Sequence, residues 1–398
     1  MENIKYLIWL NMALSNDYKS IWQTIKSHDK LENAYFSIIS GKYKIKLTDR
    51  QLKKINETSL EKAEEVVAYC AEKGVNIIRY GSENYPEKLI NIEYPPLVLY
   101  CKGNISCLSD EKNITCVGTR KPSKYTVSVI SRLCMQLAEN GFTIVSGFAE
   151  GSDINANLSA INMKRPTVCV LGCGIDVNYP KSNYPYREKI IENGGLFVSE
   201  YTPLEKSHPF KFPKRNRILV ALSDTTLVFE ASGKSGSLSI AEEAVRQNKK
   251  LLCLPPADIF DSRYAGNIRL LRDNAKPLYS IEDIFRIYNM KDVISTETIK
   301  DCTEIPAVRN LKTVKNEKDT IKNKSEESVV KMPDRKISEH SFTPVQQKIL
   351  DLLDNCTLHI DVIISKFDMD ISEIMLEIME LQFMGVIEET AGSIFRKC

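Results

Sequence analysis

The sequence predicts an α/β protein with a Rossmann-like, doubly wound and mostly parallel sheet, preceded by a small helical domain and followed by a winged-helix module. Three observations predict this architecture. Short, continuously apolar runs alternate with helical patterns between residues 113 and 288, which is typical of parallel strands buried on both faces. Residues 289–341 contain no Phe, Tyr or Trp. Hydrophobic periodicity returns from residue 342 onward.

Length and composition limit the classes of protein to consider. The 398 residues suffice for about two or three domains, and 43% hydrophobic with 27% charged residues is typical of a globular protein. The net charge is only +2, so attraction to a polyanion has to come from a local patch. We find neither a signal-peptide pattern nor ~20 consecutive apolar residues, and therefore expect a cytoplasmic protein. Eleven cysteines without a CxxC pair indicate reduced core thiols, with no metal site and no cofactor.

The predicted elements divide the chain into four segments. Residues 1–83 contain short amphipathic patterns and are expected to form a helical, SAM or helix-hairpin-like domain. Residues 84–288 comprise a proline-punctuated connector, up to Asn104, and the Rossmann-like domain. Residues 289–341 are expected to be a flexible linker, because so polar a segment has little apolar surface to offset the entropy of ordering.

Residues 342–398 are predicted to form a winged helix from three helices and a hairpin. Proline is favoured at the first position of a helix, and Pro344 marks such a start. The helices are expected from Thr343, over Ile360–Lys366 and over Ile371–Met384 with Gly385 as its stop, and the hairpin turn at Ala391 and Gly392.

The predicted recognition helix of this module is acidic. From Asp368 to Glu389 there is no Lys or Arg, so this span would repel the phosphates of duplex DNA, which winged helices usually read. We expect a protein-binding or regulatory role, and the alternative is a solvated acidic face without a partner. The acidic residues are Asp368, Asp370, Glu373, Glu377, Glu380, Glu388 and Glu389, and the core-facing stripe is Ile371, Ile374, Ile378 and Leu381.

A basic and aromatic run most clearly indicates nucleic acid. Between Lys206 and Arg217 the chain has no carboxylate. Phosphates bind cations and unstacked bases stack on rings, so this combination is typical of a single-strand site. The alternative is a solvated loop with core phenylalanines. The run contains Lys206, Phe210, Lys211, Phe212, Lys214, Arg215 and Arg217, and we expect Arg215, Asn216 and Arg217 to open a helix.

Glycines and hydroxyls follow the predicted strands, where ligands of such sheets bind. The first strand ends in Gly118, Thr119 and Arg120, and the next helix begins near Ser123 and Lys124. Free amides at a helix start, a hydroxyl and an arginine are the parts of an anion cradle.

The later turns repeat this pattern with small residues. Gly147 and Gly151 flank the second turn, and Asp153 is a candidate helix cap. Gly172–Pro180 lacks the third glycine of a dinucleotide fingerprint, so binding of NAD is weakly supported. Further candidates for phosphate contacts are Lys181, Asn183, Ser235, Gly236 and Ser237.

No catalytic set is suggested by spacing. Of the four histidines only His208 lies near the predicted site, and no nucleophile is paired with a base. We therefore expect no enzyme activity.

Several motifs in fixed order resemble the DprA/Smf family of DNA-processing proteins: CVGTR, VSGFAEGSD, CVLGCGIDVNYP, FPKRNRILVALSDTTLVFEA and SGSLSIA, with the winged helix after them. The resemblance covers nearly the whole chain. It implies a homodimer that binds and protects single-stranded DNA and loads the RecA recombinase during DNA recombination in natural transformation and competence. Together with the basic run it gives these DNA-binding residues: Gly118, Thr119, Arg120, Gly147, Gly151, Lys181, Asn183, Phe210, Phe212, Lys214, Arg215, Asn216, Arg217, Ser235, Gly236 and Ser237.

The sequence departs from the family pattern at a few positions. Thr119 stands where the family usually has Ser, and Ser152 and Asn157 replace the usual Ile and His. Pro256 replaces the glycine of the usual PG pair, and the segment after it has diverged.

The sequence leaves two other functions as alternatives. The Lonely Guy nucleotide phosphoribohydrolases share a Rossmann-like core, but Ile240 stands where their PGGxGTxxE motif places the catalytic Glu. A transcription factor acting through the winged helix is the second alternative.

Overall fold

The computed structural model describes residues 3–43, 45–273, 275–290, 342–354, 357–367, 369, 371–383, 386–390 and 394–397. The chain divides into two compact units, Met1–Thr296 and Glu297–Cys398. Residues 291–341 of the predicted linker and the predicted hairpin turn at Ala391 and Gly392 lie outside the described residues. No helix of the described part is long and apolar enough to cross a membrane.

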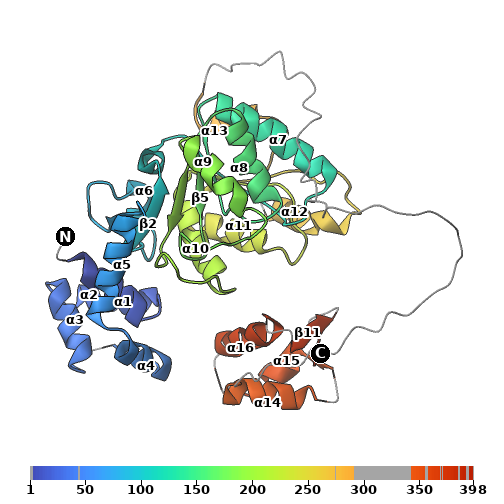
Figure 1. The fold of residues 1–398 in the computed structure, drawn as a ribbon. Helices are drawn as coiled ribbons and strands as arrows, with labels where there is room; N and C mark the ends of the chain where they lie inside the picture. Colours follow the sequence, from blue (N-terminus) through green and yellow to red (C-terminus); the bar gives the residue numbers. More distant parts are fainter. Residues whose placement is uncertain are drawn as a thin grey trace, which may run out of the picture. The chain divides into compact units, whose positions relative to one another are not determined.

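The first unit begins with a group of helices, as the sequence predicts (Figure 1). Trp9 is fully buried among them, and its indole donates to the carbonyl of Thr58 at 2.7 Å. Thr48 and Gln51 form a reciprocal capping box, which satisfies amides at a helix start. The helices are α1 (Ile4–Ala13), α2 (Tyr18–Lys26), α3 (Leu31–Ile39), α4 (Asp49–Glu57) and α5 (Leu60–Glu72).

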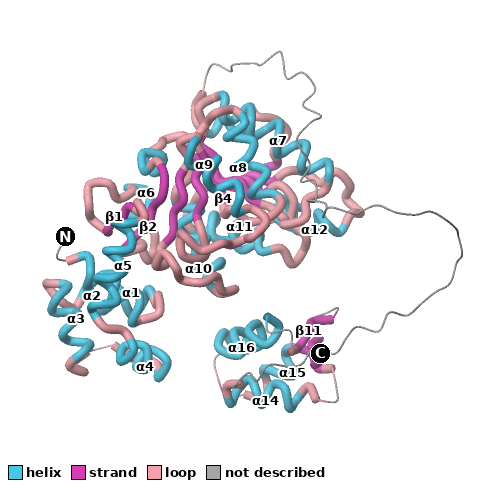
Figure 2. Tube along the Cα trace, in the orientation of Figure 1, coloured by secondary structure: helices cyan, strands magenta, loops and turns pink. Residues whose placement is uncertain are grey.

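A sheet of nine strands within the described residues forms the centre of this unit (Figure 2). Its order is β1-β2-β6-β5-β4-β3-β7-β8-β9, parallel from β6 to β9 and antiparallel across β1, β2 and β6. The mostly parallel, doubly wound sheet is therefore confirmed. The strands are β1 (Asn76–Arg79), β2 (Val98–Gly103), β3 (Asn113–Val117), β4 (Thr143–Ser146), β5 (Thr167–Val170), β6 (Leu196–Ser199), β7 (Thr225–Val228), β8 (Lys250–Cys253) and β9 (Lys276–Pro277).

Two strands lie where the sequence predicted none. β1 falls in the predicted helical domain and β2 in the predicted connector, yet both extend the sheet. Pro95 and Pro96 come just before β2, where the missing amide removes no ladder bond, so they punctuate the chain without preventing the strand. The sheet therefore begins at residue 76.

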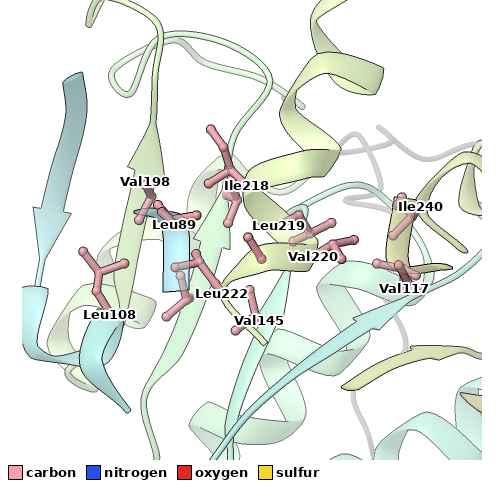
Figure 3. Close-up of a cluster of buried hydrophobic side chains, with 14 of the residues drawn as sticks. Leu89, Leu108, Val117, Val145, Val198, Ile218, Leu219, Val220, Leu222 and Ile240 are labelled. Carbon is pink, nitrogen blue, oxygen red and sulfur yellow. The ribbon is translucent and has the colours of Figure 1, made fainter. Parts of the chain in front are cut away.

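Helices cover both faces of the sheet, which explains the continuous apolar runs. On one face α7, α8 and α13 pack on Cys116, Ile144 and Leu227. On the other, Ile218 and Leu219 of α10 pack on the strands with α11 (Figure 3). The helices are α6 (Glu87–Ile90), α7 (Lys124–Glu139), α8 (Ser152–Asn162), α9 (Arg187–Glu192), α10 (Lys211–Ala221), α11 (Gly236–Arg246), α12 (Ala265–Arg272) and α13 (Glu282–Ile287).

The N-terminal helices and the sheet share one hydrophobic cluster. Leu10 and Trp9 from α1 belong to the same buried cluster as Tyr100 of β2 and Phe197 of β6. The helical domain is therefore packed against the antiparallel end of the sheet.

The second unit, described by itself, is the predicted winged helix. Thr343 caps the first helix in a capping box with Gln346, and Pro344 is its first residue. Ile374, Ile378 and Leu381 are buried as predicted, whereas the side chain of Ile371 lies outside the described residues. The elements are α14 (Pro344–Leu352), β10 (Leu358–His359), α15 (Ile360–Ile364), α16 (Ile371–Phe383), β11 (Ile387–Thr390) and β12 (Ile394–Lys397).

We expect the isolated fragment 342–398, which has its own core, to give no gel shift of duplex or single-stranded DNA at low salt. Glu373 is exposed and Glu377 half-buried on α16, so their carboxylates would repel approaching phosphates. A Glu373→Lys, Glu377→Lys variant, checked for folding by circular dichroism, should gain weak binding. Micromolar duplex binding by the unchanged fragment would instead favour the transcription-factor alternative.

Candidate nucleic-acid interface

The carboxyl ends of β3, β4, β5 and β7 meet at one edge of the sheet and surround a cavity of about 370 Å³, which we call the strand-end cleft. It gathers most of the small and polar residues that the sequence predicted for DNA. The predicted residues that line it are Gly118, Thr119, Arg120, Gly147, Phe212, Arg215, Asn216, Ser235, Gly236 and Ser237.

Glu230 follows β7 and holds the turn after β3 in place through hydrogen bonds. The amide of Thr119 donates to the Glu230 carbonyl at 2.7 Å, and the amide of Ser123 donates to its carboxylate at 2.9 Å. The hydroxyl of Thr126 donates to the same carboxylate at 2.6 Å. The start of α7 is thus occupied by the protein's own carboxylate, and the expected free amide at Ser123 is corrected.

Arg120 stands exposed at the mouth of the cleft. Its guanidinium carbon lies 6.0 Å from the centroid of the Phe212 ring. A guanidinium beside a ring can bind a phosphate while the ring holds a base.

Arg215 forms the floor of the cleft and is buried. Its guanidinium donates to the carbonyl of Gly147 at 3.1 Å and to that of Val170, at the ends of β4 and β5. Burial lowers its pKa, against the opposing effect of the Asp153 carboxylate. The floor therefore carries a cation fixed by two strand ends.

Asp153 balances this buried charge. It accepts from the amides of Gly147 at 3.1 Å and Ala149 at 3.4 Å. Burial raises its pKa, whereas Arg215 and these amides lower it. The residue that caps α8 is Gly151, with φ of 77°, so the capping role considered for Asp153 is corrected.

Phe212 forms one wall of the cleft and is half-buried. A Cβ at Gly172 would lie 2.6 Å from its ring, so only glycine lets the ring lie against the turn after β5. Tyr179 lies on the same side, with ring centroids 5.6 Å apart. An aromatic wall next to two guanidiniums suits a nucleic-acid base.

The start of α11 closes the opposite side. Ser235 is its cap and accepts from the amide of Ser237 at 3.3 Å. Asn216 donates to the hydroxyl of Ser239 at 3.0 Å, which ties α10 to α11. A Cβ at Gly236 would meet no atom within 4 Å, so this backbone faces open space.

The structure does not bring all predicted residues into the cleft. Lys181 is exposed and outside the lining, Asn183 is buried and donates to the carbonyl of Phe148 at 3.0 Å, and Gly151 lies beneath the first turn. Phe210 contacts His208, with ring centroids 4.4 Å apart.

Lys214 and Arg217 lie on the other face of α10. They line a separate groove of about 710 Å³ with Tyr18 of α2. The helix begins at Lys211, so Arg215 to Arg217 fall in its second turn and do not open it. With 3.6 residues per turn, one basic run is divided between two faces.

Several residues of the cleft were not predicted from the sequence. Tyr179, Glu150, Ser232 and Ser239 line it without having been singled out. The serines stand within three residues of the predicted Ser235 to Ser237, so the serine-rich spacing was the available signal. No feature of the neighbouring sequence indicated that Glu150 and Tyr179 line the cleft.

Two further residues bear on catalysis. Burial raises the pKa of the Cys173 thiol to about 11, so this cleft residue is protonated at neutral pH and a poor nucleophile. Ile240 also lines the cleft, at the position where the motif of the Lonely Guy phosphoribohydrolases would place the catalytic Glu.

Residues 76–289 match the family model for DNA recombination-mediator protein A, and residues 333–393 match that of the DprA winged helix domain. The chain is 35% identical to DNA processing protein DprA of Bacillus subtilis, over 62% of this chain and 82% of that protein. It is 30% identical to Protein Smf of Borreliella burgdorferi, over 79% of this chain and 95% of that protein. The X-ray structure of DNA processing protein A from Streptococcus pneumoniae is similar, with a TM-score of 0.58, 26% identity, and coverage of 71% of this chain and 97% of that one.

Proposed function

Because the chain belongs to the DprA/Smf family of DNA-processing proteins, we propose that it binds single-stranded DNA in the strand-end cleft. One observation carries the proposal: an exposed guanidinium, a buried guanidinium and an aromatic ring meet in one cavity. The cations suit phosphates, and the ring suits a base that is not stacked in a duplex.

The proposal extends to delivery of the bound strand to the RecA recombinase, without catalysis by this chain. The description of the matching family, a recombination mediator, supports this role. The absence of an acidic residue at Ile240 speaks against the hydrolase. The homodimer and the setting in natural transformation stay predictions that the resemblance implies. The cytoplasmic location stays a prediction from the sequence pattern.

Fluorescence anisotropy with labelled oligonucleotides of equal length tests the proposed function. We expect single strands to bind more tightly than duplexes across base compositions, because guanidiniums bind phosphates whatever the base and the ring needs an unstacked base. Equal or tighter binding of the duplex contradicts the proposal.

We expect Arg120→Ala to weaken binding of every single strand and to reduce the slope of log K against log salt by about 0.7, the value for one phosphate contact. Titrations at several salt concentrations measure both quantities. Arg132→Ala is the matched control, since Arg132 is exposed on α7 outside the cleft lining. An unchanged slope for Arg120→Ala would remove this residue from the interface.

A further inference from the structure

The face of α10 that carries Lys214 and Arg217, which we call its back face, is joined to the N-terminal helices by one buried carboxylate. The hydroxyl of Tyr18, the first residue of α2, donates to Glu200 at 2.6 Å, and the guanidinium of Arg217 donates to the other oxygen of Glu200. The guanidinium carbon of Arg217 also lies 4.0 Å from the centroid of the Tyr18 ring. Tyr18 therefore holds Arg217 both through Glu200 and through its ring.

A second contact one turn away reinforces the first. The ammonium of Lys214 donates to the carbonyl of Asn16 at 3.4 Å and lies 5.3 Å from the centroid of the Tyr18 ring. Asn16 has a φ of 53°, in the left-handed turn that joins α1 to α2. Two cations of α10 thus meet the same end of α2.

Tyr18 and Arg217 both keep their protons across the physiological pH range. Burial and the neighbouring Glu200 raise the pKa of Tyr18, so its hydroxyl remains a donor. Burial lowers the pKa of Arg217, but Glu200 and Tyr18 outweigh this effect and the pKa is raised overall. Arg217 is therefore charged at physiological pH and forms an ion pair with Glu200.

The opposite face of the same helix carries Phe212, Arg215 and Asn216, which line the strand-end cleft. α10 has only 11 residues, so if the helix rotates or shifts at Lys214 and Arg217, the side chains on its opposite face move by a similar amount. Positions of groups that bind a ligand matter at the level of an ångström.

We propose that Tyr18 is a positioning residue for single-stranded DNA binding: it fixes the rotation of α10 through Glu200 and Arg217 and thereby sets Phe212 and Arg215 in the cleft. The N-terminal helical domain then contributes to DNA affinity without contacting DNA. This inference rests on the proposed function of the cleft.

Tyr18→Phe removes the hydroxyl and keeps the ring over Arg217. We expect its affinity for a single strand to fall about three- to thirtyfold, the range for a residue that acts through another. Its slope against log salt should equal that of the unchanged protein, because no phosphate contact is lost. Combination with Arg217→Lys should be non-additive, because both changes act on one network.

Tyr69→Phe is the matched control. The hydroxyl of Tyr69, on α5, donates to Asp176 at 3.2 Å and so also joins the N-terminal helices to the sheet unit, but it does not reach α10. We expect this variant to bind like the unchanged protein, with thermal unfolding of both variants measured so that titrations are made on folded chains. Should Tyr18→Phe unfold early, its binding is measured at a lower temperature at which the variant is folded, and the affinity should still fall without a change in the slope.

The outcomes separate the two proposals. Failure of the unchanged protein to bind single strands at low salt contradicts the proposed function. If the unchanged protein binds and Tyr18→Phe binds equally well, only the positioning role is overturned. Equal losses in Tyr18→Phe and Tyr69→Phe would also overturn it, since general docking of the helices would then be the cause.

Discussion

Arg215→Ala is expected to abolish single-stranded DNA binding and to lower the free energy of unfolding by about 3 to 5 kcal/mol, the effect of removing one partner of a buried charged pair. The substitution leaves the carbonyls of Gly147 and Val170 without their donor and the buried Asp153 without an opposing charge. Urea unfolding followed by circular dichroism measures the stability, and anisotropy at a temperature where the variant is folded measures the affinity.

A double variant separates the two effects of Arg215. Arg215→Leu with Asp153→Asn removes both charges, so stability should largely recover while DNA binding should not. Recovery of binding in the double variant would show that Arg215 acts only through the fold. Normal binding by the folded single variant would exclude Arg215 from the interface altogether.

Phe212→Leu is expected to cost about 1 to 3 kcal/mol of binding free energy, the value of one base stacked on a ring. The melting temperature should change little, because Phe212 is half-buried at the wall of the cavity. An oligonucleotide with abasic positions gives an independent measurement: it should bind more weakly than a normal strand to the unchanged protein, but not to the variant.

Phe210→Leu is the control for this substitution. Phe210 precedes α10 and contacts His208, outside the cleft, so its replacement should affect affinity much less. A Phe212 variant that unfolds early and binds normally in the cold would show that the ring belongs to the core.

The features that the sequence predicted correctly depend on neighbours along the chain. Period and run length indicated β3 to β8, and Pro344 after Thr343 marked a helix start, because caps and buried strands have local signatures. The cleft followed from the same reasoning, since parallel strands end at one edge.

The features that it did not predict depend on distant residues. Arg217 is paired with Glu200, 17 residues away, and with Tyr18, 199 residues away, so nothing in the basic run indicated which face of α10 it occupies. Glu230 accepts from the amide of Ser123, the cap of α7, from a distance of 107 residues along the chain. β1 is a short strand whose place is set by pairing with β2, which no periodicity of its own reveals.

The hydrophobic cluster shared by Trp9, Leu10, Tyr100 and Phe197 has a consequence for how the first unit melts. Side chains that are buried against one another lose their contacts together, so the N-terminal helices and the sheet should unfold as one cooperative block. A shortened chain starting at residue 76, where the family match begins, would expose the apolar side of β2 to water. We expect such a chain to aggregate, because exposed apolar patches associate. We therefore expect the segment that unfolds cooperatively, which includes the N-terminal helices, to be longer than residues 76–289, which match the family model.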